Sequence, residues 1–288
     1  MNKPLIRIAT LVVGLAAAFS AHAVDTWTYN SVSGGAGVDT ASSGATALTT
    51  TGAYITNNGT SGVSGNWTVK TTPDSNGYSS QLQYYSGGGL GMDSDGNATP
   101  NHALDNNGTY TEAVLLNFTT STFLTGIDLG YVSGDADISV FRYTGTTPPT
   151  LNGTAGTLSG MNAAGWSLVG NYANLTQDNT TPYAYNLING ATDGDPSSGV
   201  APTASGSSVG SSWWLITAYN SAYGTGSGLT QGDDYFKLLS VAGSACTGVS
   251  AQCGNTTTKK VPEPGSLALA SLALMGVFFS RRKPVQKH

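Results

Sequence analysis

The chain has 288 residues, of which hydrophobic residues make up 39% and charged residues only 9%. These values exclude a charge-rich helical protein and a coiled coil, and the hydrophobic and aromatic content excludes a wholly disordered chain. Between Val24 and Thr258, three basic residues (Lys70, Arg142 and Lys237) stand against fifteen acidic ones. Because an acidic surface repels phosphate backbones, nucleic acid is not expected as a partner.

The first 23 residues have the parts of a secretory signal peptide. A basic start and an apolar run from Ile8 to Phe19 precede Ala21-His22-Ala23, the small-residue pattern that signal peptidase accepts. An uncleaved membrane anchor is the alternative, but the run is shorter than the roughly 20 apolar residues that a span prefers. We therefore expect cleavage after Ala23 and a mature chain that starts at Val24.

Residues 24–253 show the pattern of a single all-β domain. Short apolar-polar alternations are separated by Gly, Asn, Asp and Ser clusters, and no long stretch has a helical period. Many strands with turns between them favour a β-sandwich or a jelly roll. The expected strands run from Asp25 to Val32, Asn66 to Lys70, Gln81 to Tyr85, Glu112 to Phe118, Leu124 to Val132, Ala136 to Tyr143, Trp166 to Tyr172, Ser212 to Tyr219 and Tyr235 to Val241.

Two parts of this domain are ambiguous. The stretch from Ser33 to Ser64 has few large apolar residues, and we expect either edge strands or a loosely ordered lead-in. In the strand that ends at Tyr143, Ile138 and Val140 fall on one face, whereas Phe141 and Tyr143 fall on the other. Both faces of that strand are therefore expected to be at least partly covered.

An oxygen-rich turn is a candidate calcium site. Asp93, Asp95 and Asn97 alternate oxygen ligands around a glycine, as a hard cation requires, but the complete EF-hand pattern is not met. A solvated turn is the alternative, because Asp, Asn and Gly favour turns without any metal. The sequence therefore requires no cofactor, and calcium is the one that it suggests. A second oxygen-rich set consists of Asp105, Asn106 and Glu112.

Exposed aromatic rings could stack on the C–H faces of sugars. Successive residues of a strand face opposite ways, so we expect at most one of Trp213 and Trp214 in the core and the other free to contact a sugar. Core packing is the alternative. Further candidates are Tyr84, Tyr85, Tyr219 and Tyr223.

Catalytic groups are few. His102 is the one histidine between the two terminal segments, and residues 206–210 match a nucleophile elbow only formally, because they lie in a Gly/Ser loop followed by a strand. Glu112 is the one glutamate of the body, so no pair of carboxylates for glycoside hydrolysis stands out. We therefore do not expect an enzyme.

Cys246 and Cys253 are the two cysteines of the chain. In an exported protein, oxidising surroundings favour a disulfide between them. Because the loop is short, this disulfide would stabilise the end of the domain only modestly. An intermolecular link is the alternative.

The C-terminal end has three parts. After a polar spacer at residues 254–261 come Pro262-Glu263-Pro264, an apolar run from Gly265 to Ser280, and Arg281-Arg282-Lys283. A helix over that run would measure about 24 Å, slightly short of a hydrocarbon layer of about 30 Å. Basic residues after a span hold that side in the cytoplasm. We therefore expect a single transmembrane helix that anchors the protein only temporarily in the inner membrane.

This end resembles the PEP-CTERM sorting signal of Gram-negative bacteria that make extracellular polysaccharide, with all three parts in order over residues 262–288. The resemblance implies that exosortase, an integral-membrane cysteine protease-transpeptidase, recognises the signal and removes or exchanges it during export. The alternative is a plain C-terminal anchor in which the prolines merely stop a helix. A softer resemblance connects the stretches 101–106, 112–118 and 135–140 with a block of exosortase-dependent surface proteins, and it implies a β-sandwich of unknown activity.

These features predict an exported protein that passes from an inner-membrane-anchored intermediate to the cell surface or the extracellular matrix. Its expected role is structural or adhesive within the polysaccharide matrix. The expected partners are signal peptidase, exosortase and extracellular polysaccharide. A lectin-like carbohydrate-binding module is the alternative, and a secreted hydrolase ranks third.

Overall fold

The computed structural model describes residues 25–29, 38–43, 46–58, 62–71, 82–94, 102–177, 185–186 and 209–246, with the backbone alone for 38–43 and 185–186. The expected signal peptide (1–23), spacer (254–261) and sorting signal (262–288) lie outside these residues. Asp95, Asn97 and Cys253 lie outside them as well.

The described residues form one 13-stranded sheet of antiparallel pairs. Two short helices accompany it, α1 (Leu158–Ala163) and the single-turn η1 (Ser221–Tyr223). Within the described ranges, no helix is long and apolar enough to cross a membrane. The strands are β1 (Asp25–Thr28), β2 (Val38–Ser43), β3 (Thr46–Asn57), β4 (Val63–Lys70), β5 (Gln83–Tyr85), β6 (Gly89–Gly91), β7 (Leu104–Asp105), β8 (Tyr110–Val132), β9 (Ile138–Tyr143), β10 (Trp166–Tyr172), β11 (Tyr185–Asn186), β12 (Ser211–Ala218) and β13 (Tyr235–Ala245).

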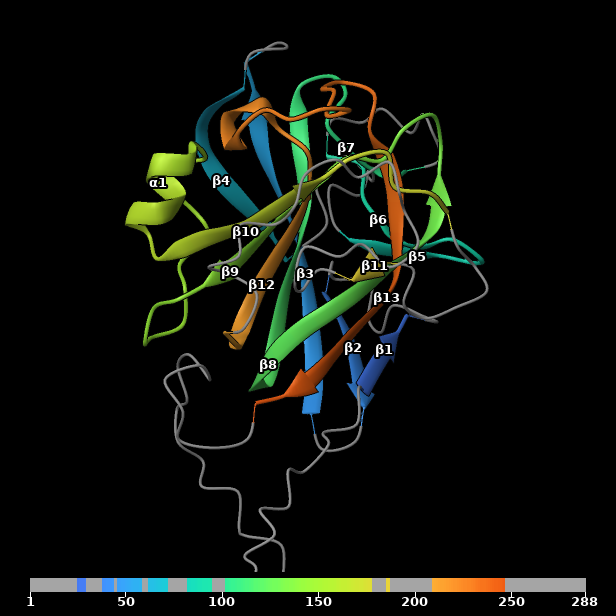
Figure 1. Ribbon diagram of the computed structural model, residues 1–288, viewed down its shortest axis with the longest axis vertical. Coiled ribbons are helices and arrows are strands. Elements are labelled where there is room, and N and C mark those ends of the chain that lie inside the picture. The colour runs from blue at the N-terminus through green and yellow to red at the C-terminus, as the bar shows by residue number, and fades with distance from the viewer. Residues whose placement is uncertain are drawn as a thin grey trace, which may run out of the picture. The chain divides into compact units, whose positions relative to one another are not determined.

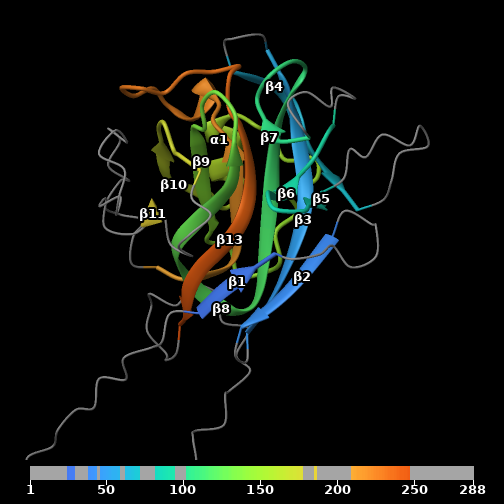
Figure 2. The ribbon, with the colours of Figure 1, turned by 90° about the vertical axis from the view of Figure 1, so that its right-hand side faces the viewer.

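Strand β8 connects the two halves of the sheet. Its first part, up to Phe118, lies between β3 and β12, and its second part, from Thr122 onward, pairs with β13. Figures 1 and 2 show that β8 turns back at its middle. The sheet therefore folds over on itself, with β3, β12, β9 and β10 continuing from the first part and β13, β6 and β5 from the second.

The larger core lies between these two halves. Leu116 and Phe118 from the first part of β8 belong to the same apolar cluster as Leu124 and Ile127 from the second part. Before Thr125 the residues of β8 that face the larger core have even numbers, and after it Ile127 and Leu129 have odd numbers. Thr125 has no partner in the pairing with β13, so it forms a β-bulge. This extra residue keeps the apolar side chains inside after the turn.

A second core covers the other face of the first half. Leu115 of β8, Phe141 of β9 and Leu215 of β12 pack there with Met161 of α1. Helix α1 begins at Thr157, whose side chain accepts a hydrogen bond from the Gly160 N–H as an N-cap. Both faces of β9 are therefore buried, as its sequence pattern predicted.

The all-β prediction is confirmed, and the finer details differ. The strand pairings show one continuous sheet folded over, and they do not show a jelly roll. The two strands expected from Glu112 to Val132 are one strand, β8, because the intervening threonines and serine also adopt an extended backbone. The stretch expected to be peripheral holds β3, which pairs with β8 from Leu48 to Thr56.

Candidate functional site

The hairpin formed by β5 and β6 lies against β13 and forms one side of a pocket. Its turn is closed by the Gly88 N–H, which donates to the Tyr85 carbonyl at 2.9 Å. A side chain at Gly130 of β8 would place its Cβ 2.5 Å from the Gly88 carbonyl oxygen, so glycine is needed where the two backbones approach. This close approach brings Tyr85 beside Lys237.

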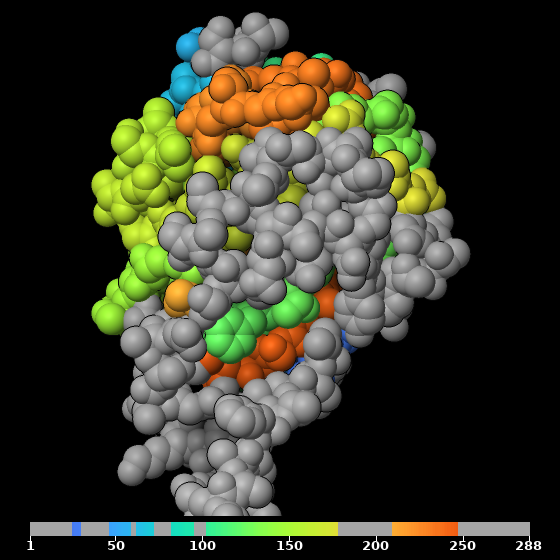
Figure 3. Space-filling view, in the orientation of Figure 1, coloured from blue at the N-terminus to red at the C-terminus, as the bar shows by residue number. Residues whose placement is uncertain are grey.

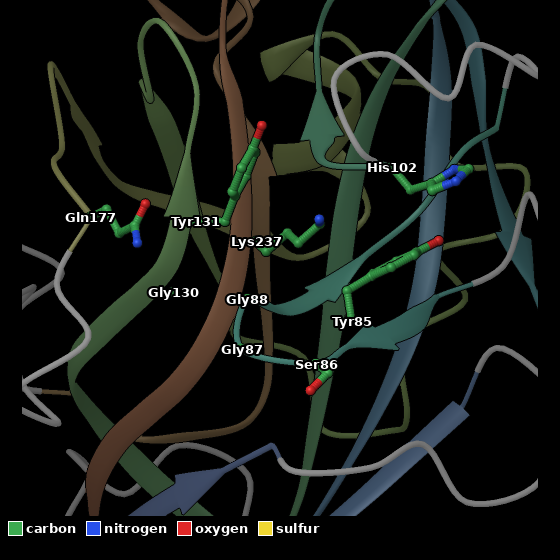
Figure 4. Close-up of a pocket in the computed structure, with 9 residues that line it drawn as sticks. All are labelled: Tyr85, Ser86, Gly87, Gly88, His102, Gly130, Tyr131, Gln177 and Lys237. Carbon is green, nitrogen blue, oxygen red and sulfur yellow. The ribbon is translucent and has the colours of Figure 1, made fainter.

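Lys237 lies at the centre of this pocket. It stands opposite Tyr131 in the pairing of β13 with β8. Its Nζ lies 4.5 Å from the centroid of the Tyr85 ring and 4.5 Å from that of the Tyr131 ring, so two cation–π contacts hold the ammonium group. Lys237 is only 4% exposed, and burial lowers the pKa of its amine. Figure 4 shows the side chain between the two tyrosines.

His102 also lies against Tyr85. The two rings stack with their centroids 5.2 Å apart. His102 Nδ1 lies 3.2 Å from Asp93 Oδ2, and the Asp93 carboxylate is buried. Tyr85 therefore contacts both a lysine and a histidine, and the histidine ring is itself held by a carboxylate (Figure 4).

These groups line a pocket of about 360 Å³. Two tyrosine rings offer flat apolar faces, while the lysine, histidine, serine and glutamine side chains offer polar atoms. Flat rings beside hydrogen-bonding groups suit a ligand that alternates C–H and O–H groups, such as a sugar. The lining residues are Tyr85, Ser86, Gly87, Gly88, His102, Gly130, Tyr131, Gln177 and Lys237.

A cluster of carboxylates lies near the start of β13. Ligand atoms of Asp135, Asp137 and Asp234 are all within 4.8 Å of one another. The Asp137 carboxylate accepts hydrogen bonds at 2.6 Å from the N–H groups of Asn174 and Thr230. Thr230 belongs to the segment between η1 and β13, which appears in orange at the top of Figures 1 and 3. The cluster therefore connects three loops at this end of the sheet.

Burial and mutual repulsion shift the acidity of this carboxylate cluster. Burial, with the neighbouring carboxylates adding to it, raises the pKa of Asp137 to about 6 and that of Asp234 to about 9. Asp234 also accepts a hydrogen bond at 2.5 Å from the Asp137 N–H and another from the Asn106 side-chain amide. Carboxylate oxygens grouped in this way could hold a hard cation. Sequence reasoning missed the group because nearly a hundred residues separate Asp137 from Asp234.

The comparison with protein families gives one match. The family model described as a PEP-CTERM protein-sorting motif matches residues 260–283. The chain carries a PEP-CTERM sorting motif. The matched residues include all three predicted parts, namely Pro262-Glu263-Pro264, the apolar run and Arg281-Arg282-Lys283. The motif implies that the protein is exported, processed by exosortase and delivered to the cell surface. Neither a curated protein nor a solved structure matches the chain.

The two tryptophans expected to contact sugar lie elsewhere in the body that precedes the PEP-CTERM motif. Trp214 is 2% exposed, and its Nε1 donates to the carbonyls of Thr122 and Ser211, so it belongs to the larger core and cannot offer its ring to a ligand. Trp213 points the opposite way and packs, partly buried, against the second core. Trp214 is thus the one of the two that enters the core, and Trp213 is the one that stays partly exposed.

The structure describes one of the three residues of the first calcium candidate. Asp93 contacts His102, while its expected companions Asp95 and Asn97 lie outside the described residues. Glu112 accepts hydrogen bonds at 2.6 Å from both the N–H and the hydroxyl group of Ser94, so it ties this turn to β8. The second expected set was Asp105, Asn106 and Glu112. The Asn106 side chain instead donates a hydrogen bond to the Asp234 carboxylate and accepts one from the Asp234 N–H, so this set does not form one oxygen cage.

The remaining sequence candidates fall at the edge of the described residues. Cys246 follows β13 and is buried. Because Cys253 lies outside the described residues, their pairing ahead of the PEP-CTERM motif stays a prediction. Ser207 and Ser208 of the formal nucleophile elbow lie outside them as well. Of the candidate tyrosines, Tyr219 and Tyr223 are buried, and Tyr85 lines the pocket.

Proposed function

We propose that this protein is an adhesive component of the extracellular polysaccharide matrix that binds polysaccharide through the pocket around Lys237. The PEP-CTERM motif supports the location, because it implies delivery to the cell surface. The observation that carries the binding role is the pair of tyrosine rings, Tyr85 and Tyr131, fixed on either side of a lysine. The proposal thus combines the adhesive role with lectin-like sugar contact.

The rigidity of the pocket supports a binding role. Tyr85 contacts both Lys237 and His102, and glycines at the hairpin let the backbone lie directly on β8 and β13. Side chains that are already fixed lose little conformational entropy on binding, which favours affinity for a weakly bound ligand such as a sugar.

The test is binding of the exported protein to polysaccharide extracted from the matrix of the same cells. Tyr85→Ala should weaken binding about tenfold, which corresponds to about 1.4 kcal/mol. The matched control is Tyr110→Ala, because Tyr110 is also a partly buried tyrosine with an aromatic neighbour, Tyr54, but does not line the pocket. Equal binding by the two variants would contradict the proposal.

The proposal is of a binding protein and not of an enzyme. Glu112 is 2% exposed and bonded to Ser94, which suits a structural role better than catalysis. Incubation with the polysaccharide should therefore release no reducing ends. Steady release that is lost in a folded Glu112→Gln variant would require a hydrolase instead.

We also propose that the protein reaches the surface through an inner-membrane intermediate. The apolar run from Gly265 to Ser280 and the basic residues after it support this step. Exosortase and signal peptidase are the partners that act during transit, whereas polysaccharide is the partner of the finished protein.

A further inference from the structure

Among the described residues, the cation in the pocket has no counter-ion. Lys237 is 4% exposed, and in the part of the chain that the structure describes its Nζ contacts two tyrosine rings, with no carboxylate within ion-pair distance. A buried charge without an opposite charge is unfavourable, and aromatic rings offset that only in part. The lowered pKa of this amine agrees with such a position. An anion beside Nζ would stabilise the charged form.

The charge of the pocket is opposite to that of the body around it. Fifteen acidic residues lie between Val24 and Thr258, against three basic ones. Of the described residues, those that line the pocket include Lys237 and His102 and no carboxylate. The acidic surface repels anions in general, so an anion would be bound where this local positive charge outweighs the repulsion.

The rest of the lining suits a sugar ring and not a bare ion. The two tyrosine rings lie on either side of the ammonium group, and the Ser86 hydroxyl and the Gln177 amide come from separate segments of the lining (Figure 4). A volume of about 360 Å³ lies at the lower end of the range for small-ligand sites, about 300–1,000 Å³. A bare inorganic anion would leave the aromatic faces without contact.

We infer that the pocket binds a sugar unit that carries a carboxylate, as in the uronic acids of acidic polysaccharides, with the carboxylate at Lys237 Nζ and the sugar ring against Tyr85 or Tyr131. This inference rests on the proposed function and names its ligand class. A neutral sugar would leave the lysine without its counter-ion and should bind more weakly.

The experiment compares two probes on the exported protein: an oligomer of galacturonic acid, and the same oligomer after reduction of its carboxyl groups to alcohols. The wild-type protein should bind the acidic oligomer at least tenfold more tightly by calorimetry. Lys237→Met keeps the length of the side chain and removes the charge, so it should abolish that preference. Lys237→Arg keeps the charge and should retain most of it.

Lys70→Met is the matched control. Lys70 also lies over a tyrosine ring, that of Tyr54 at 5.9 Å, and does not line the pocket. Its replacement removes one positive charge from the same body and should leave the preference unchanged. Thermal unfolding of each variant verifies that it is folded.

Three results would overturn the inference or its basis, and they differ from one another. Equal binding of the two oligomers by the wild-type protein would reject the carboxylate and leave sugar binding in place. The same loss in Lys70→Met as in Lys237→Met would show that overall charge, and not this pocket, is responsible. Absence of binding to any matrix polysaccharide would reject the proposed function itself.

Discussion

The buried carboxylates Asp137 and Asp234 should make the protein less stable as the pH rises from about 4 to about 9. Both are 0% exposed, and their pKa values are raised from 3.8 to about 6 and about 9. Well below pH 3.8 both groups are protonated in the folded and the unfolded chain. Above that pH the unfolded chain ionises while the folded chain keeps its protons, so stability is lost as the pH rises through the folded pKa values.

The magnitude follows from Asp137. A pKa change from 3.8 to about 6 corresponds to about 3 kcal/mol, or about 2 kcal/mol once solvent screening near the partly exposed Asp135 is allowed for. Asp234 acts in the same direction from the same pH of about 4, and its effect continues up to about pH 9. For a domain of this size, about 2 kcal/mol lowers the unfolding midpoint by roughly 4–8 °C.

Urea unfolding in buffers from pH 4 to pH 9 measures this change, and the fluorescence of four buried tryptophans (Trp27, Trp67, Trp166 and Trp214) reports it. Asp137→Asn should have a smaller decline between pH 4 and pH 7 because the titrating group is gone. Asp25→Asn is the control, since Asp25 pairs with Gly243 near the far end of β13. A free energy of unfolding that stays constant or rises in the wild-type protein over that interval would refute the reasoning.

Three further outcomes are expected. The form recovered from the envelope or the medium should begin at Val24 and lack residues 281–288, as measured by intact mass. Replacing Pro262 and Pro264 with alanine should leave the protein in the inner membrane. A mature protein that keeps its whole tail would contradict exosortase processing. Trp214→Ala should lower the free energy of unfolding by about 3–5 kcal/mol, and Trp213→Ala should lower it by less because the Trp213 ring is only partly buried. Equal losses of stability in the two variants would contradict this expectation. Calcium should raise the unfolding midpoint at pH 8 and not at pH 4, because Asp137, whose pKa is raised to about 6, is ionised at pH 8 and protonated at pH 4. A chelator should reverse the change, and no effect at pH 8 would remove calcium as a ligand of the cluster of Asp135, Asp137 and Asp234.

The sequence by itself determined where the protein is delivered. The PEP-CTERM motif and its basic tail are contiguous, and they can be recognised without the fold because each part depends only on its neighbours in the chain. It also determined most strands with strong alternation, and β10 spans the predicted residues from Trp166 to Tyr172. The period of two along a strand is a local property, so it can be read before any partner strand is known.

The tertiary structure decided which strands lie in the centre. Strand β3 has mostly threonine, alanine and glycine, and its pattern indicated the periphery. Its small side chains let the backbone pass close to other segments, since a Cβ at Gly52 would lie 3.1 Å from the Leu82 nitrogen. Whether such a strand becomes central depends on its partner β8, and that pairing is not encoded in either strand alone.

The same reason applies to the sites. The pocket is formed by four separate segments, which contribute Tyr85, His102, Tyr131 and Lys237. These segments meet because β8 turns back, β13 pairs with its second part, and the β5–β6 hairpin pairs with β13. The sequence did not show which of Trp213 and Trp214 lies in the core, and the folded-over sheet buries Trp214. Composition specified how many aromatic and acidic side chains the body has, whereas the folding of one sheet onto itself determined which of them face a pocket, because that depends on contacts between residues far apart in the chain.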